Sequence, residues 1–241
     1  MALPRDELVF GFWPARQLRG EIPDAIQHPR EYSGGDVLNI ACTQTGLPAS
    51  RQKALVRDWC TLLPEISVRT LVFSSKVSQE LFDAACAVPG LEALSVKWSS
   101  IHSLQALSGL CTLRAFYLGS APSVESLKPI SRLAAIEHLF ISGIPGPVDL
   151  SFVEGLNTLR EFGVAAGRGH RLRVDSLQPL ASLHRLELLW LVSMQIRNGG
   201  LLPLYSLRNL SSLRTTMSES AKDFQALCLA LPNLKHFQRV G

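Results

Sequence analysis

Histidine and glutamate side chains are the groups of this sequence best suited to acid–base chemistry, and one pair is placed to meet. His138 and Glu161 occupy the same position in two similar segments, IEHLFI from Ile136 and LREFGV from Leu159. A His–Glu contact can create a general base, but catalysis also requires a pocket and a nucleophile. Neighbouring strands of an open sheet supply little desolvation, so we expect an ordinary cross-strand pair here.

Other patterns that carry chemistry are missing from the sequence. Walker A, GxSxG, HExxH and GxGxxG spacings do not occur, and the remaining histidines form no metal-ligand spacing within a segment. The five cysteines are scattered, odd in number and without a CxxC pair, which favours buried free thiols in a reducing compartment. They are Cys42, Cys60, Cys86, Cys111 and Cys228. We therefore expect a non-enzymatic protein with no cofactor and no metal.

The bulk composition indicates a globular chain. Of 241 residues, 46% are hydrophobic and 18% are charged, which suffices for a continuous core. A formal charge of +4 is too small to indicate nucleic-acid binding. No apolar run approaches the ~18 residues of a membrane span, and the start MALPRDELVFGFW carries acids where a signal peptide needs bases. We expect a cytoplasmic protein that does not associate with membranes.

Elements that would position these side chains recur with a regular period. Six segments have apolar residues at their first, fourth and sixth positions, and their starts lie 23, 22, 23, 23 and 27 residues apart. They are VRTLVF from Val68, LEALSV from Leu91, LRAFYL from Leu113, IEHLFI from Ile136, LREFGV from Leu159 and LELLWL from Leu186. Intervening segments such as SLKPISRL and SLQPLASL have leucines three apart and a proline, which favours short 3₁₀ turns.

With one strand and one helical turn per repeat, the sequence resembles the leucine-rich-repeat family. Its pattern of leucine, serine and proline positions is most similar to bacterial internalin repeats. The resemblance covers residues 66–241, as about seven to eight units. It implies an α/β solenoid: a curved parallel sheet on the concave face and short helices or 3₁₀ turns on the convex face. A seventh unit could start at Leu210 or Leu213, and LKHF from Leu234 would be the last.

The family's asparagine, which satisfies backbone groups after the strand, is absent here, so we expect serine, water or local backbone pairing in that role. Its positions hold Lys76, Ser99, Ala121, Ile144, Gly167 and Met194.

The first 65 residues lack the period and are expected to cap the amino-terminal end of the solenoid. Residues 7–13 and 36–41 could be strands, and residues 50–63 read as a helix that opens with a capping serine. Residues 223–231 would form the last helix and help to close the other end.

Bulky rings gather at the fifth position of the repeat, which should face outward on the concave side. That column reads Val72, Ser95, Tyr117, Phe140, Gly163 and Trp190. Tyr117 and Phe140 should be direct neighbours, and Trp190 should stand exposed across the gap at Gly163. These rings could simply shield one another, but three large aromatics in one column favour a docking strip for a partner. We call Tyr117, Phe140 and Trp190 the aromatic strip.

Charges of alternating sign fill the second position of the same six strands. They are Arg69, Glu92, Arg114, Glu137, Arg160 and Glu187. Opposite charges on adjacent strands attract, which predicts a ladder that fixes the strand register. Arg114, Glu137, Arg160 and Glu187, with His138 and Glu161 at the third position, could equally form a polar rim beside the aromatic strip.

Two further features lie near this surface. Residues 167–173, GRGHRLR, lengthen one repeat and include Arg168 and Arg171, which predicts either a solvated loop or a basic finger that seeks an acidic protein surface. Trp98, just after a strand, could pack against the amino-terminal cap or extend the strip.

The resemblance and the strip together favour protein–protein recognition through a rigid concave face, because a preformed surface loses little entropy on binding. By analogy at the level of the fold, we expect an immunity-type inhibitor that neutralises a bacterial toxin or effector. The alternative is a nucleic-acid-associated or general scaffold protein that uses the basic insertion 167–173. An enzyme would need a catalytic domain, and the first 65 residues are short and carry no motif for one.

Overall fold

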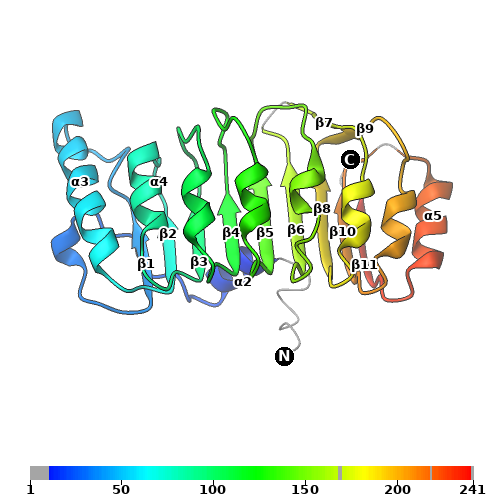
Figure 1. Cartoon of the computed structure of the whole chain (residues 1–241), viewed down its shortest axis with the longest axis horizontal. Coiled ribbons are helices and arrows are strands. Elements are labelled where there is room, and N and C mark those ends of the chain that lie inside the picture. The colour runs from blue at the N-terminus through cyan, green and yellow to red at the C-terminus, as the bar shows by residue number, and fades with distance from the viewer. Residues whose placement is uncertain (1–10, 168–169, 218, 240–241) are drawn as a thin grey trace.

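A parallel sheet runs the length of the molecule, in a computed structural model that describes residues 11–167, 170–217 and 219–239. Its strand order is β1-β2-β3-β4-β5-β6-β8-β10-β11 (Figure 1). The bounds are β1 Val37–Ile40, β2 Thr70–Phe73, β3 Ala93–Val96, β4 Ala115–Leu118, β5 His138–Ser142, β6 Glu161–Ala165, β8 Leu188–Val192, β10 Ser212–Thr215 and β11 His236–Arg239. All six strands expected from the repeat are therefore confirmed.

Helical segments connect the strands and lie together in front of the sheet (Figure 1). They are α3 Ala49–Leu62, α4 Gln79–Cys86, α5 Ala221–Ala230 and the 3₁₀ turns Gln105–Gly109, Lys128–Arg132, Leu150–Val153, Gln178–Ser182 and Leu202–Ser206. We call the opposite side of the sheet the concave face. The predicted α/β solenoid, with short turns on the convex side, is confirmed.

The core lies between these two layers. Leucines at the fourth position of the repeat, such as Leu71, Leu94 and Leu139, are fully buried. Each 3₁₀ turn also buries one leucine or isoleucine: Leu107, Ile130, Leu150, Leu180 and Leu204. Because one strand and one turn cannot bury their apolar faces alone, each repeat depends on its neighbours for stability.

The register of the seventh repeat is decided by strand pairing. Ser212 pairs with Leu188 and Arg214 pairs with Trp190. The repeat therefore starts at Leu210, and Arg214 takes the fifth position. The last unit follows the same register, because Ser212 also pairs with His236 in β11.

Residues outside the six clear repeats lie at both ends of the sheet. β1 extends the sheet beside β2, and Trp59 of α3 is fully buried with its indole N–H bonded to the carbonyl of Gln27 at 2.9 Å. α3 has no side-chain cap, so the expected serine cap at Ser50 is wrong. α5 has one instead, because Ser220 and Asp223 form a capping box.

Local backbone pairing replaces the missing asparagine in at least one turn. The amide of Val77 donates to the carbonyl of Trp98 at 3.0 Å, and the amide of Ser99 donates to the carbonyl of Ser120 at 3.1 Å. Successive turns thus satisfy one another across the repeat, as expected from the sequence.

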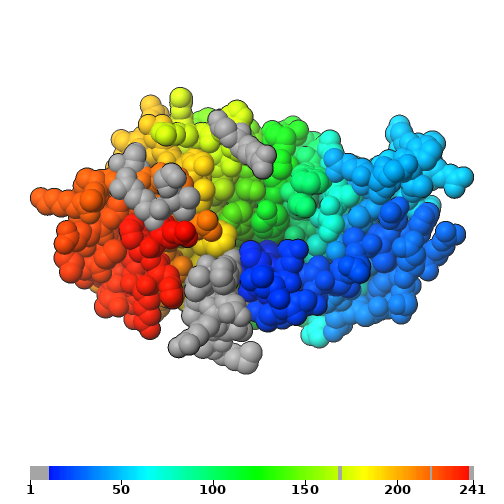
Figure 2. All heavy atoms as spheres, turned by 180° about the vertical axis from the view of Figure 1, so that it is seen from behind, coloured from blue at the N-terminus to red at the C-terminus, as the bar shows by residue number. Residues whose placement is uncertain are grey.

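The amino-terminal segment departs from the sequence prediction. Phe12 and Trp13, expected at the end of a strand, instead begin the helix α2, Phe12–Leu18, and residues 7–10 lie outside the described residues. Figure 2 shows the deep blue segment in the middle of the molecule on the side away from the convex helices. The described residues of the amino-terminal region therefore lie at one end of the sheet and also cover part of its concave face.

Candidate functional site

The aromatic strip forms a continuous row of rings on the concave face. Tyr117 pairs with Phe140 in the sheet, and their rings stack with centroids 5.3 Å apart and planes 8° apart. Phe140 meets Trp190 edge to face at 5.5 Å and 86°. The expected neighbours are confirmed, and the row has no break between its second and third members.

Gly163 makes that continuity possible. β6 separates β5 from β8, so Phe140 and Trp190 are two strands apart. A Cβ at position 163 would overlap Cδ2 and Cε2 of the Phe140 ring. The ring therefore lies across the glycine and reaches the indole on the far strand. The gap that the sequence places at Gly163 is filled by Phe140.

Trp190 is half-buried, so the prediction that it stands exposed is wrong. Phe140 covers one side of it, and the guanidinium of Arg214 lies 5.4 Å from its ring centroid, within cation–π range. Its Nε1 is buried without a hydrogen-bond acceptor among the described residues. Arg214 was missed from the sequence because the register near Leu210 was open, although the fifth-position count from Leu210 would have found it.

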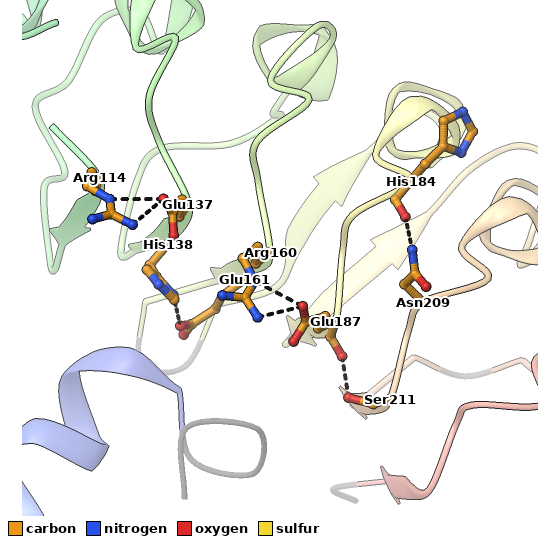
Figure 3. A network of polar contacts seen from close by, with 9 residues as sticks. All are labelled: Arg114, Glu137, His138, Arg160, Glu161, His184, Glu187, Asn209 and Ser211. Carbon is orange, nitrogen blue, oxygen red and sulfur yellow. Dashed lines mark hydrogen bonds and ion pairs between the residues drawn. The ribbon is translucent and has the colours of Figure 1, made fainter. Parts of the chain in front are cut away.

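Each arginine at the second position lies beside the glutamate of the next repeat. The nearest nitrogen–oxygen distances are 2.6 Å for Arg114–Glu137 and 2.7 Å for Arg160–Glu187 (Figure 3). Arg69 lies 3.9 Å from Glu92 and closer, at 2.8 Å, to Asp36. The expected pairing of each arginine with a carboxylate is confirmed. Among the described residues, Arg69 contacts both Asp36 and Glu92, and the other two arginines form separate pairs rather than one continuous ladder. A phosphate backbone would have to compete with these partners for each arginine.

His138 and Glu161 do meet, with Nδ1 and Oε2 3.1 Å apart (Figure 3). Both were expected on an open face, but they are 6% and 4% exposed. The cause is α2: the ring of Phe12 stacks on His138 with centroids 4.5 Å apart, and the Phe12 amide donates to Glu161 Oε2 at 2.8 Å. The pair is covered by a segment far away in the sequence, which the repeat pattern could not reveal.

Trp98 contacts the amino-terminal region through its indole. It is 38% exposed, its Nε1 donates to Gln44 Oε1 at 2.6 Å, and the amine of Lys97 lies 4.7 Å from its ring centroid. Of the two placements expected for it, the structure shows packing against the amino-terminal region.

The end of the basic insertion belongs to a strand. This strand is β7, Leu172–Val174, which pairs in parallel with β9, Met194–Ile196, in a separate two-stranded sheet. This small sheet lies at one edge of the main sheet (Figure 1). Arg171 is exposed, and Arg168 lies outside the described residues.

The cysteines differ in burial, and Cys60 is half-buried. Cys42 and Cys86 are buried, as expected, whereas Cys111 and Cys228 are exposed, which corrects the expectation for those two. Burial raises the pKa of the Cys42 thiol to about 11 and also raises the pKa of Cys86. The thiols in the core are thus poor nucleophiles. Among the described residues, no group of three His, Cys, Asp or Glu side chains is arranged to hold a metal.

No helix within the described ranges combines the length and apolar character of a membrane span. No protein-family model matches the sequence, and no curated protein matches it either.

Solved structures do resemble the fold. An internalin, InlF, of Listeria monocytogenes aligns with 80% of this chain and 50% of its own, at a TM-score of 0.57 and 16% identity. A leucine-rich-repeat protein of Leptospira interrogans aligns with 71% of this chain and 46% of its own, at 0.53 and 14%. The plant peptide hormone receptor RGFR1, in complex with RGF2, aligns with 74% and 29%, at 0.58 and 14%.

This chain thus spans half or less of the length of these three proteins. With its repeated strands, its convex turns and these similarities, the chain has the leucine-rich-repeat fold, a solenoid of the kind found in internalins.

Proposed function

We propose that this protein recognises a protein partner, without catalysis, through the aromatic strip on its concave face. The observation that carries the proposal is the continuous contact from Tyr117 through Phe140 to Trp190 and on to Arg214. Aromatic and arginine side chains dominate the binding energy of protein interfaces, at about 2 kcal/mol or more for the strongest.

The strip is held in place before a partner arrives. Each ring projects from a strand that pairs on both sides, and Gly163 fixes how far Phe140 leans toward Trp190. Little side-chain freedom therefore remains to be lost on binding, which favours affinity. A rigid row of rings is also poorly hydrated, because stacked aromatic faces offer water few hydrogen-bonding groups.

The surroundings of Trp190 indicate what the partner should bring. Its Nε1 is buried without an acceptor among the described residues, and the Arg214 guanidinium lies beside the ring. A carbonyl or carboxylate oxygen next to an apolar side chain would satisfy both groups. This chemistry belongs to protein and peptide surfaces. RGFR1, which has a similar fold, is described in complex with RGF2, so the architecture is compatible with such binding.

The specific role that we propose is inhibition: the partner is a toxin or effector that the solenoid holds inactive, as an immunity-type protein does. This step rests on analogy at the level of the fold. Its test is the activity of the captured partner, which should fall in proportion to the bound fraction. A partner that keeps full activity in the complex would contradict inhibition and leave recognition standing.

The experiment for recognition is capture of partners from the source cell with the wild type and with Tyr117→Ala and Trp190→Ala. Each substitution should remove one stoichiometric partner, because it deletes an anchor of the strip. Leu202→Ala is the matched control, since Leu202 is 71% exposed on the convex side. Capture that is unchanged in both strip variants would overturn the proposal.

The same capture also tests the alternative of nucleic-acid binding. That function predicts binding that falls steeply with salt, depends on Arg171 in the insertion and ignores the aromatic strip.

A further inference from the structure

The middle of the concave face is already occupied by a segment of this chain. α2 contacts Glu161 and His138 at its first residue and Thr70 through Arg16. Because Thr70 lies on β2 and Glu161 on β6, the helix crosses the strands between them. The third-position residues on these five strands are all buried: Thr70, Ala93, Ala115, His138 and Glu161.

We call the surface beneath α2, formed by His138, Glu161 and Thr70, the seat, and its contacts with α2 are chemically specific. Phe12 stacks on His138, and its backbone amide donates to the Glu161 carboxylate, which also contacts His138. The helix buries Ala15 completely. Arg16 donates to Thr70 Oγ1 at 3.1 Å and lies 5.4 Å from the Phe12 ring centroid. A carboxylate that accepts from a backbone amide selects for a segment's geometry as well as for its side chains.

Gly11 shows how closely this segment approaches the seat. A Cβ at Gly11 would collide with Glu161 Oε1, and the residue has a φ of +83°, which favours glycine. The backbone thus enters the seat at a position where other side chains would be excluded.

The helix has features of an occupant that can leave. It has only seven residues and no side-chain cap, and a helix of that length is not stable alone in water. Gly20, at its carboxyl end, has a φ of +68° and open space around it. The indole Nε1 of Trp13 is buried without an acceptor among the described residues, which opposes tight packing.

The seat adjoins the aromatic strip. Trp13 of α2 and Tyr117 of the strip line the same cavity, of about 550 Å³, which Lys97 and Ser95 also border. A partner that docks on Tyr117 therefore meets α2 at once.

We propose that α2 is an intramolecular stand-in for the partner, and that the His138–Glu161 seat receives an aromatic-led helical segment of the partner when α2 is displaced. This inference rests on the proposed function and adds the chemistry of the ligand: a phenylalanine-type ring whose own amide is free to donate, with a small residue three positions later, where α2 has the buried Ala15. α2 then acts as an autoinhibitory segment, because its covalent link gives it an effective concentration in the range of mM. A partner segment must therefore bind the seat more favourably than α2 does at this effective concentration.

The test uses the full chain and a fluorescent peptide of residues 11–19, GFWPARQLR. Binding to the wild type should be weak, because α2 fills the seat. Phe12→Ala/Trp13→Ala releases α2 and should tighten peptide binding about tenfold or more. Adding Glu161→Gln should then weaken it about tenfold, since the charge that accepts the amide is lost. Glu154→Gln, at an exposed convex position, is the control and should change nothing.

Equal peptide binding by the wild type and the Phe12→Ala/Trp13→Ala chain, or binding that ignores Glu161→Gln, would overturn the inference. Hydrogen exchange on the wild type gives a second readout that needs no variant. The amides of Ala15 and Arg19, bonded within α2, should exchange about 100-fold faster than that of Leu139 in the sheet. Equal protection would show that α2 is a fixed part of the fold and would also overturn it.

These results separate the two proposals. Partner capture lost on Trp190→Ala, together with no peptide binding to the released chain, leaves recognition standing and removes the stand-in role of α2. Peptide binding together with capture that ignores the strip supports the seat and contradicts the strip.

Discussion

The ring of Phe140 lies over Gly163, in the space that any side chain at that position would need. This relationship joins the two halves of the aromatic strip. It also shows that the strip depends on the strand between its members, because the residue between Phe140 and Trp190 must have no Cβ. The glycine is therefore as much a part of the surface as the three rings.

Gly163→Ala should displace Phe140 from Trp190 and destabilise the protein by about 1–3 kcal/mol, the usual range for overpacking. Chemical denaturation measures the loss, and quenching of Trp190 fluorescence reports the ring movement. Gly109→Ala is the matched control, because a Cβ there meets no atom within 4 Å. A Gly163→Ala chain as stable as the control would show that Phe140 moves freely.

Leu139→Ala should destabilise the solenoid by about 2–5 kcal/mol, because Leu139 is fully buried between the sheet and the convex turns. Leu229→Ala, at a residue 81% exposed, should change stability by less than about 0.5 kcal/mol. Thermal unfolding followed by circular dichroism compares the two. Similar melting temperatures would contradict the placement of the core.

The Arg160–Glu187 pair should contribute more than Arg114–Glu137. The side chains of the first pair are 22% and 24% exposed, whereas Arg114 is 56% exposed. Double-mutant cycles to alanine should give about 1 kcal/mol for Arg160–Glu187 and less for the other pair, with both falling as salt is added. The reverse order would mean that solvent screening does not decide their strength.

Thiol reagents should separate the cysteines of the folded protein. Cys111 and Cys228 are exposed and should be labelled rapidly at pH 8, whereas Cys42, whose pKa burial raises to about 11, should be protected until the chain unfolds. Mass spectrometry of the labelled peptides identifies the sites. Rapid labelling of Cys42 in the native state would contradict the packing of the amino-terminal region.

The raised pKa values also predict a loss of stability in alkali. Cys42 and Cys60 have ordinary values of 9.0 and folded values of about 11, so the folded state holds their protons more tightly. Their contribution is fully present below about pH 9 and is lost as the pH rises toward about 11. Denaturation midpoints across this range should fall less steeply in Cys42→Ala than in the wild type. Identical slopes would exclude this thiol as a cause.

Much of the fold was predictable from the repeat. The positions of six strands and of the convex turns, the neighbours Tyr117 and Phe140, and the contact of His138 with Glu161 all follow from a period of about 23 residues. That works because a solenoid places equivalent residues of successive repeats side by side, so sequence register becomes spatial register. The register at Leu210 could not be chosen, since two leucines fit equally, and Arg214 was missed with it.

Local sequence determined the six clear repeats, their strand register and their columns of side chains, because each depends on apolar spacing within and between neighbouring repeats. Only the tertiary structure decided which of those side chains remain exposed to solvent. Phe12 covers His138 and Glu161 from a position more than a hundred residues away, and Phe140 reaches Trp190 over Gly163. Such coverage depends on packing between distant segments, which leaves no periodic signal in the sequence.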